Sequence, residues 1–206
     1  MSAAPRRRLV VGMTGATGAI IGIRLLEALK DLLDVETHLV LSNWARSTIE
    51  LETPYTVRHV TGLADVHHKA HDQGATIASG SFRTDGMVVV PCSVKTLAGI
   101  RTGYADTLLG RAADVTLKEG RRLVLVPRET PLSQIHLENL LALAQRGATV
   151  FPPVPAFYNH PRSLDDMVDH FVSRILDQFG LPAPRARRWP GLPEARALPV
   201  DADAPA

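Results

Sequence analysis

The chain has 206 residues, of which 45% are hydrophobic and 21% charged, so it can form the core of an ordinary globular domain. A formal net charge of +2 and an aromatic content of 5% disfavour nucleic acid as a partner, because neither a basic field nor a base-stacking surface is indicated. The single cysteine excludes an internal disulfide and a paired-cysteine zinc site. No apolar run reaches the roughly 18 residues that span a bilayer. We therefore expect a cytoplasmic protein without a membrane partner.

Short apolar runs alternate with helical patterns along the chain, which predicts a mostly parallel sheet with helices on both faces. The apolar stretch after Arg6–Arg8 is interrupted by Gly12, Thr14 and Gly15, so we expect a first strand and a turn here and not a signal peptide. The expected strands are residues 9–13, 38–41, 87–91, 123–127 and 149–151. The expected helices are residues 19–33, 43–51, 94–100, 135–145 and 164–179, and 53–81 is expected to hold loops and short elements.

We expect one domain over residues 1–206, with tails at 1–8 and about 183–206 that are flexible or docked on a neighbouring copy. The arginines of the second tail, Arg185, Arg187 and Arg188, are expected to be solvated. In a parallel sheet the binding crevice lies at the carboxyl ends of the strands, so the residues that follow each apolar run are the first candidates for a site.

The first strand runs into a glycine-rich turn in which Gly12, Gly15, Gly18 and Gly22 are spaced 3, 3 and 4 apart. Glycines allow a close approach of the backbone to an anion, and the helix that follows offers free amide protons. The spacing differs from G-x-G-x-x-G, and the second strand ends in Ser42 without a carboxylate for a ribose. A mononucleotide is therefore favoured over NAD, and a structural turn without a ligand is the alternative.

Two further strand ends carry candidate groups. Ser93 and Thr96 stand at the start of a helix, where Ser93 either caps the helix or donates to a ligand oxygen. Cys92 is expected to be a small core residue and not a nucleophile. Arg128 can grip a phosphate with two bonds, and Glu129 beside it can accept a proton, with surface ion pairing as the alternative.

Two other groups are placed less clearly by the sequence. Lys118 and Glu119 precede the strand that Arg128 follows, so chain order alone does not bring them together. The histidines His67, His68 and His71 precede Asp72 at a helical i, i+4 spacing that could ligate a metal, but a solvated loop is favoured and no metal is expected.

Several segments together resemble the UbiX-type flavin prenyltransferases, which are also described as small B subunits of hydroxyarylic acid decarboxylases. The resemblance covers about residues 9–180 and is carried by GMTGATGAIIG, ASGSF, PCSVKTLAGI, RAADVTLKEGRRLVLVPRETPLSQIHLENL and PPVPAFYNHP. It implies a Rossmann-like (flavodoxin-type) three-layer sandwich. It also implies a transferase that joins a dimethylallyl group from dimethylallyl phosphate to N5 and then C6 of reduced FMN, without a metal.

The resemblance further implies that the product, prenylated FMN, passes to a UbiD-type decarboxylase. Members of the family usually form homododecamers with active sites at subunit interfaces. Its flavin contacts match Gly15, Ala16, Thr17, Ser42, Ser93, Val94, Lys95, Thr96 and Arg128. Its prenyl-phosphate residues match Lys118, Glu129, Tyr158 and Arg174, and its catalytic set matches Thr17, Glu52, Lys118, Arg128 and Glu129.

The chain departs from the family pattern at two places. Thr17 stands where many relatives have serine, which preserves the hydroxyl. Residues 72–77 contain no aromatic side chain where some relatives place a tryptophan against the prenyl group, which leaves the choice between a mono- and a diphosphate donor open. Two other functions also stay open: a flavin-dependent decarboxylase of the phosphopantothenoylcysteine decarboxylase type, for which Asn43–Ala45 offers no matching histidine, and a non-catalytic flavin-delivery subunit.

Overall fold

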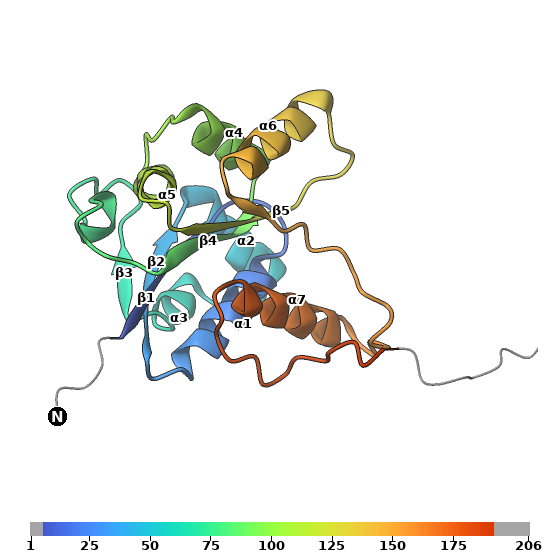
Figure 1. The fold of residues 1–206 in the computed structure, drawn as a ribbon. Helices are drawn as coiled ribbons and strands as arrows, with labels where there is room; N and C mark the ends of the chain where they lie inside the picture. Colours follow the sequence, from blue (N-terminus) through green and yellow to red (C-terminus); the bar gives the residue numbers. More distant parts are fainter. Residues whose placement is uncertain (1–5, 192–206) are drawn as a thin grey trace, which may run out of the picture.

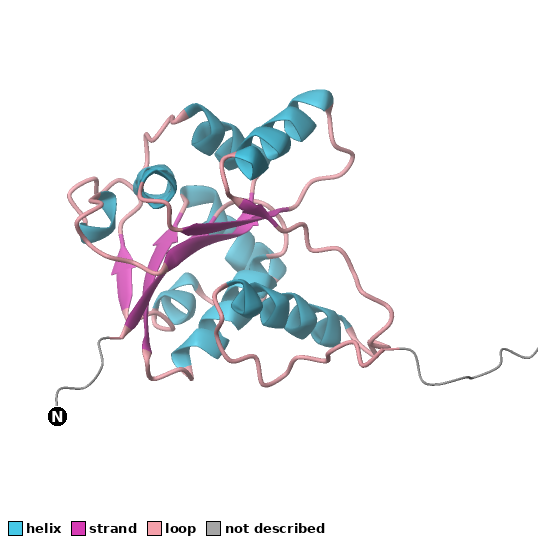
Figure 2. Ribbon diagram, in the orientation of Figure 1, coloured by secondary structure: helices cyan, strands magenta, loops and turns pink. Residues whose placement is uncertain are grey.

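The computed structural model describes residues 6–191, whose six strands form one all-parallel sheet in the order β3-β2-β1-β4-β5-β6 (Figure 2). The strands are β1 (Arg7–Met13), β2 (Val35–Leu41), β3 (Val66–His68), β4 (Gly86–Cys92), β5 (Arg122–Pro127) and β6 (Thr149–Val150). The chain leaves β1 toward one edge and returns to β4 on its other side. Ligands bind where the strand order of a doubly wound sheet reverses, and here this place lies between β1 and β4.

Helices cover both faces of the sheet, which confirms the predicted three-layer α/β sandwich (Figure 1). One face carries α1 (Ala19–Lys30), α2 (Asn43–Glu52), α3 (Val57–Thr61) and α7 (Leu164–Gln178); the other carries the 3₁₀ helix η1 (Thr76–Ala78), α4 (Val94–Thr102), α5 (Leu108–Lys118) and α6 (Gln134–Gln145). Within residues 6–191, no helix combines the length and the apolar character that crossing a membrane requires.

The side chains of each strand alternate between two cores, because successive residues of a strand point to opposite faces. In β4, Val88 and Val90 join the core under α1 and α7, whereas Met87 and Val89 join the core under α4 and α5. All four are completely buried. Helix α1 lies so close to β4 that a Cβ on Gly22 would come within 2.6 Å of the Val90 carbonyl oxygen. This close packing holds the first turns of α1, which follow the glycine turn, against β4.

Three elements differ from the sequence expectations. Helix α1 ends at Lys30, and Leu33, which was counted on its apolar face, is 88% exposed in the turn to β2. Strand β1 begins at Arg7, so Arg7 and Arg8 belong to the sheet and not to a tail. Helix α5 was not predicted, although Thr107 caps it and its small and apolar residues follow a helical period.

Residues 183–191 pack on α7 of the same chain, where a flexible or neighbour-docked tail was expected. The arginines contact acidic residues of that helix: Arg185 contacts Asp169 and Arg188 contacts Asp177. The name C-terminal strap is used below for residues 183–191. The remainder of the two expected tails, residues 1–5 and 192–206, lies outside the described residues.

Candidate active site

A cavity of about 620 Å³ opens at the carboxyl ends of β1 and β4, where the strand order predicts a binding crevice. Its wall contains five of the predicted flavin contacts, namely Gly15, Ser42, Ser93, Lys95 and Thr96. The other lining residues are Thr14, Asn43, Trp44, Ala70, His71, Gly99, Ile100, Tyr104, Asp106, Thr107, Leu109 and Gly110. The volume falls within the roughly 300–1,000 Å³ of ordinary ligand pockets.

Thr14 ties the two central strands together at the floor of the cavity. Its side chain is buried, and its hydroxyl donates to the Pro91 carbonyl at 2.9 Å while accepting from the Ser93 amide at 2.7 Å. Ser93 then caps α4 by accepting from the Thr96 amide at 3.3 Å, and the two hydroxyls lie 3.0 Å apart. Ser93 is therefore a helix cap that also lines the cavity, so the two alternatives of the sequence analysis are compatible.

The glycine turn exposes backbone donors beside the cavity. Within residues 6–191, no protein group accepts a hydrogen bond from the amides of Gly15, Ala16 or Thr17. Successive free amides before a helix are well suited to an anion or to flavin carbonyl oxygens. On the neighbouring strand end, Ser42 caps α2 by accepting from the Ala45 amide at 3.1 Å. Both strand ends thus present polar groups to one space.

Glu52 closes the start of α1. Gly18 caps this helix with φ at +98°, a conformation that favours glycine, and supplies no side-chain acceptor. One carboxylate oxygen of Glu52 accepts from the amides of Gly18 at 2.8 Å and Ala19 at 3.2 Å. The negative charge also suits the positive end of the helix dipole. Glu52 therefore lies next to Thr17 at the edge of the site, outside the cavity wall.

Arg128 and Glu129 follow β5 directly and are both exposed. The Arg128 amide donates to the Cys92 carbonyl at 3.3 Å, which fixes the backbone of Arg128 beside the start of α4. Neither side chain belongs to the cavity wall. Cys92 itself is completely buried, and burial raises the pKa of its thiol far above the ordinary value, which agrees with a core role.

Tyr158, in the loop before α7, and Arg174, on α7, form a second group. The Tyr158 ring meets the His170 ring edge-on, with centroids 5.9 Å apart. Arg174 lies one helical turn beyond His170, and burial together with the Arg174 charge lowers the pKa of that histidine. The structure therefore brings two predicted prenyl-phosphate residues into one neighbourhood, although neither lines the cavity.

Lys118 lies at the opposite end of the chain's own sheet from the cavity. Leu109, near the start of α5, lines the cavity, and the helix rises about 14 Å before it reaches Lys118. Lys118 forms an ion pair with Glu119, which lowers the pKa of that carboxyl, and the pair packs against Gly80. Within one copy of the chain, Lys118 therefore lies apart from the other predicted site residues.

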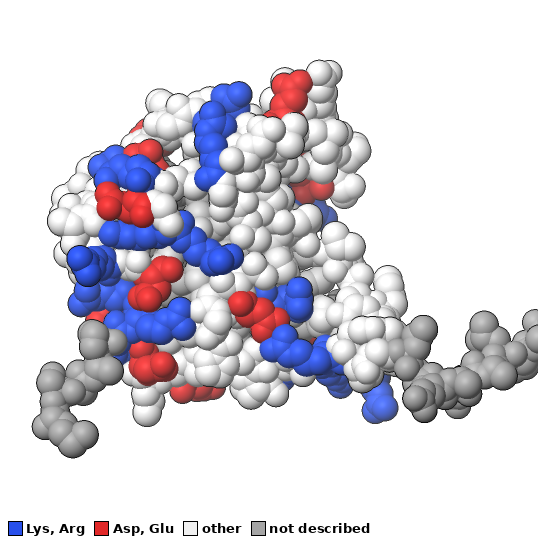
Figure 3. Space-filling view, in the orientation of Figure 1, with Lys and Arg blue, Asp and Glu red and all other residues white. Residues whose placement is uncertain are grey.

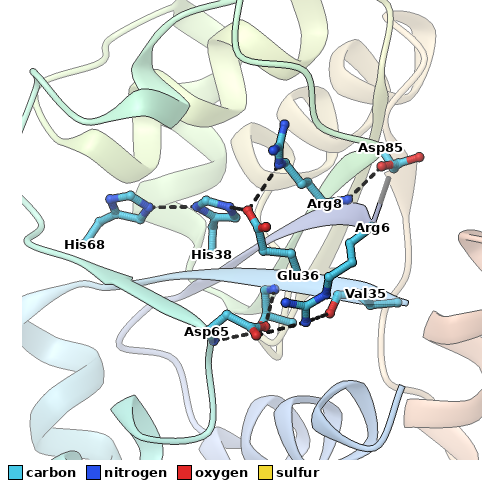
Figure 4. Close-up of polar contacts among 9 residues, drawn as sticks. Arg6, Arg8, Val35, Glu36, His38, Asp65, His68 and Asp85 are labelled. Carbon is cyan, nitrogen blue, oxygen red and sulfur yellow. Dashed lines mark hydrogen bonds and ion pairs between the residues drawn. The ribbon is translucent and has the colours of Figure 1, made fainter. Parts of the chain in front are cut away.

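The histidine cluster does not have the helical geometry that its spacing suggested. His67 and His68 lie on β3, and His71 lies in the following turn and lines the cavity. His68 instead faces buried His38, with 3.0 Å between the His68 Nε2 and His38 Nδ1 atoms, and His38 Nε2 lies 2.8 Å from Glu36 Oε1 (Figure 4). No group of three potential metal ligands occurs within residues 6–191.

Charged side chains of both signs are intermixed over the face drawn in Figure 3. Ion pairs also connect neighbouring elements of the fold, such as Arg8 with Glu36 and Arg24 with Asp169. The face therefore presents no broad region of a single charge.

The cavity residues that the sequence did not reveal include Thr14, Trp44 and Tyr104. Thr14 was read as part of the turn, although a polar residue directly after a buried strand is itself a signal for a site. Trp44 and Tyr104, which are 74% and 66% exposed, lack any motif of their own. They reach the cavity through the folding of α2 and of the loop before α5.

Comparisons with known proteins agree on one family. A family model described as Flavoprotein matches residues 2–176. A relative from Streptomyces sp. (strain D7), named probable UbiX-like flavin prenyltransferase, is 71% identical over 190 residues, which cover 92% of this chain and 95% of the relative.

Two solved structures have the same fold. A dodecameric FMN-dependent UbiX-like decarboxylase from Escherichia coli O157:H7 is 68% identical with a TM-score of 0.89, and the match covers 89% of this chain and 100% of that one. AnUbiX (PadA1) in complex with FMN and dimethylallyl pyrophosphate is 56% identical with a TM-score of 0.89, covering 91% and 100% of the two chains.

Proposed function

The chain belongs to the UbiX-type flavin prenyltransferases, and we propose that it joins a dimethylallyl group from dimethylallyl phosphate to N5 and C6 of reduced FMN. The observation that carries this proposal is the cavity of about 620 Å³ at the β1–β4 switch point, with Gly15, Ser42 and Ser93 in its wall. The alternative activity of a cysteine decarboxylase is not supported by the high identity to named prenyltransferases.

The residues around the cavity fit FMN. Free amides of the glycine turn and the hydroxyls of Ser42, Ser93 and Thr96 supply donors for phosphate and for the polar edge of the ring. We propose Gly15, Ala16, Thr17, Ser42, Ser93, Val94, Lys95, Thr96 and Arg128 as the flavin contacts. Glu52 holds the amides of Gly18 and Ala19, so the free amides that precede them keep their positions for the ligand.

Reduced flavin supplies the nucleophilic N5 and ring C6, and the protein residues handle the leaving group and the protons. When the allylic carbon–oxygen bond breaks, its electron pair leaves with the phosphate. Lys118, Arg128 and Arg174 can stabilise this developing negative charge, and Tyr158 can donate a hydrogen bond to it. The N5 proton would leave as the first bond forms. The second bond would use the double bond of the dimethylallyl group, which takes up one proton while C6 gives one up, and Glu129 or the released phosphate can carry these protons.

The position of Lys118 requires more than one copy of the chain if it acts at the cavity. We propose a homo-oligomer, with a dodecamer as in the E. coli O157:H7 relative, in which Lys118 of the partner subunit completes the site. Helix α6 supports an assembly surface, because Ile135, Leu137 and Leu141 are between 53% and 67% exposed. Exposed apolar side chains on one element are typical of protein interfaces.

We further propose that the chain is one flavoprotein domain, that it works in the cytoplasm, and that a UbiD-type decarboxylase receives the prenylated FMN. The single sheet of residues 6–191 supports the first point. The third is what the resemblance to the UbiX-type family implies, because those enzymes hand prenylated FMN to such a decarboxylase.

The proposal is tested by anaerobic incubation of the purified protein with reduced FMN and dimethylallyl phosphate, followed by mass spectrometry of the released flavin. We expect the flavin mass to rise by one C5H8 unit. Parallel reactions with the monophosphate and the diphosphate determine the donor. Flavin that stays bound but unmodified with both donors would contradict the transferase and favour the flavin-delivery alternative.

A further inference from the structure

The carboxylate of Asp177 on α7 is shared unequally by two arginines. Arg188 of the C-terminal strap donates from Nη1 to Oδ2 at 2.6 Å and from Nη2 to Oδ1 at 2.7 Å. Arg174, three residues before Asp177 on the same helix, reaches Oδ2 only at 3.5 Å. The planar fork of Arg188 therefore occupies both oxygens of the carboxylate, and Arg174 has only a long contact.

This arrangement controls how much positive charge Arg174 can offer to another anion. The hydrogen bonds from Arg188 are the main cause that lowers the pKa of Asp177, so the carboxylate stays ionised at neutral pH. A residue three positions away on a helix is a natural ion-pair partner. Without Arg188, the free carboxylate would close on Arg174 and neutralise it. The Arg174 side chain is 49% exposed, so it is able to rotate toward either partner.

The same strap also holds Tyr158. The Trp189 ring meets the Tyr158 ring edge-on, with centroids 5.5 Å apart, on the residue directly after Arg188. Arg187 donates to the Asn159 carbonyl at 3.4 Å and lies 3.8 Å from Asp166. The C-terminal strap thus contacts both the loop of Tyr158 and Asp177, the acidic partner of Arg174. The sequence alone had predicted a solvated tail for this segment.

We propose that Arg188 is a positioning residue that keeps Arg174 available for the phosphate of the allylic substrate by holding Asp177. This inference rests on the proposed function, which assigns Arg174 and Tyr158 to the prenyl phosphate. Arg188 itself does not touch the substrate. Arg188 binds the Asp177 carboxylate, and the next residue of the strap, Trp189, contacts Tyr158.

The test compares two variants that remove the same ion pair. Arg188→Ala leaves the Asp177 carboxylate free to capture Arg174, so KM for dimethylallyl phosphate should rise about tenfold, the loss expected for one charge-assisted contact. Asp177→Asn also removes the ion pair but leaves no charge to capture Arg174, so KM should stay within about twofold of the wild type. FMN affinity should be unchanged in both variants, because neither residue lies in the cavity wall.

A double variant and a matched control complete the design. Arg188→Ala combined with Asp177→Asn should restore KM, since the competing carboxylate is gone. Arg185→Ala removes another arginine of the same strap, whose contact is with Asp169, and should leave KM unchanged. If Asp177→Asn or the double variant raises KM as much as Arg188→Ala does, the ion pair only anchors the strap and the proposal is overturned.

Arg174→Ala separates this proposal from the function on which it rests. If Arg174→Ala raises KM and Arg188→Ala does not, only the positioning role is overturned. If Arg174→Ala leaves KM unchanged, the assignment of Arg174 to the prenyl phosphate is itself wrong, whereas transfer to the flavin can still be measured by the mass of the product.

Discussion

Replacement of Gly15 by alanine should disturb the cavity by moving the start of α2. Gly15 lies at the turn after β1 and faces Trp44, which is the second residue of α2. A Cβ added to Gly15 would lie 3.3 Å from both the Cα and the carbonyl carbon of Trp44, and closer still to its Cβ. A change of the Trp44 rotamer cannot relieve this contact, because none of the three atoms moves with the indole ring.

The size of the effect follows from this geometry. Carbon atoms prefer separations of about 3.5–4.0 Å, so the first turn of α2 must retreat, and overpacking of this kind costs about 1–3 kcal/mol. The same turn carries Ser42 and Trp44, which both line the cavity. If the complex is destabilised by about 1.4 kcal/mol more than the free protein, because the displaced Ser42 and Trp44 no longer fit the ligand, the affinity for FMN falls about tenfold.

Equilibrium titration with FMN and thermal unfolding without it measure the two consequences separately. Gly74→Ala is a suitable control, because its new Cβ would meet only the Asp72 side chain, at 3.4 Å, and Gly74 lies outside the cavity wall. We expect Gly74→Ala to behave as the wild type. A Gly15→Ala variant with wild-type FMN affinity and an unchanged unfolding temperature would refute the reasoning.

Two further predictions concern stability. Glu52→Ala removes the acceptor for two amides at the start of α1, so the free energy of unfolding should fall by about 1 kcal/mol. Glu52→Gln retains one acceptor oxygen and should lose less. Denaturant titration measures both variants, and a free energy of unfolding equal to that of the wild type in both would contradict the prediction. Burial lowers the pKa values of His68 and His170 below the ordinary 6.5, so the folded protein binds fewer protons than the unfolded chain as pH falls through that value. The stability from these groups is therefore present above pH 6.5 and lost below it, and calorimetry should give a lower unfolding temperature at pH 5.5 than at pH 7.5. An unfolding temperature that rises on acidification would contradict this sign.

Sequence patterns predicted the fold well where local rules and burial agree. The buried runs of β4 and β5 have no alternation, since helices cover both faces of the sheet, and this identified them as central parallel strands. The pattern failed at Leu33, because an apolar residue at a helical period is not always buried, and at Arg7 and Arg8, whose backbone pairs with Val35 and Glu36 although their side chains are charged.

The candidate site was predictable only in part. Residues at strand ends, such as Ser42 and Ser93, meet in one cavity because the topology of a parallel sheet requires it. Nothing local in the sequence indicates that Tyr104 lines the same cavity, or that Arg188 binds Asp177 eleven residues earlier. Such contacts depend on how α5 and the strap pack after folding, which no motif or period encodes.

Lys118 precedes β5 and Arg128 follows it, so the two cations stand at opposite ends of a strand about 20 Å long. If both act on one leaving phosphate, every active site combines residues from different copies of the chain. A substitution of Lys118 in one chain would then lower the activity of the active site in the adjacent subunit. A variant without Lys118 and a variant without Arg128 could then restore activity when they are mixed in one oligomer. Some active sites of that oligomer would contain an intact Lys118 from one variant and an intact Arg128 from the other.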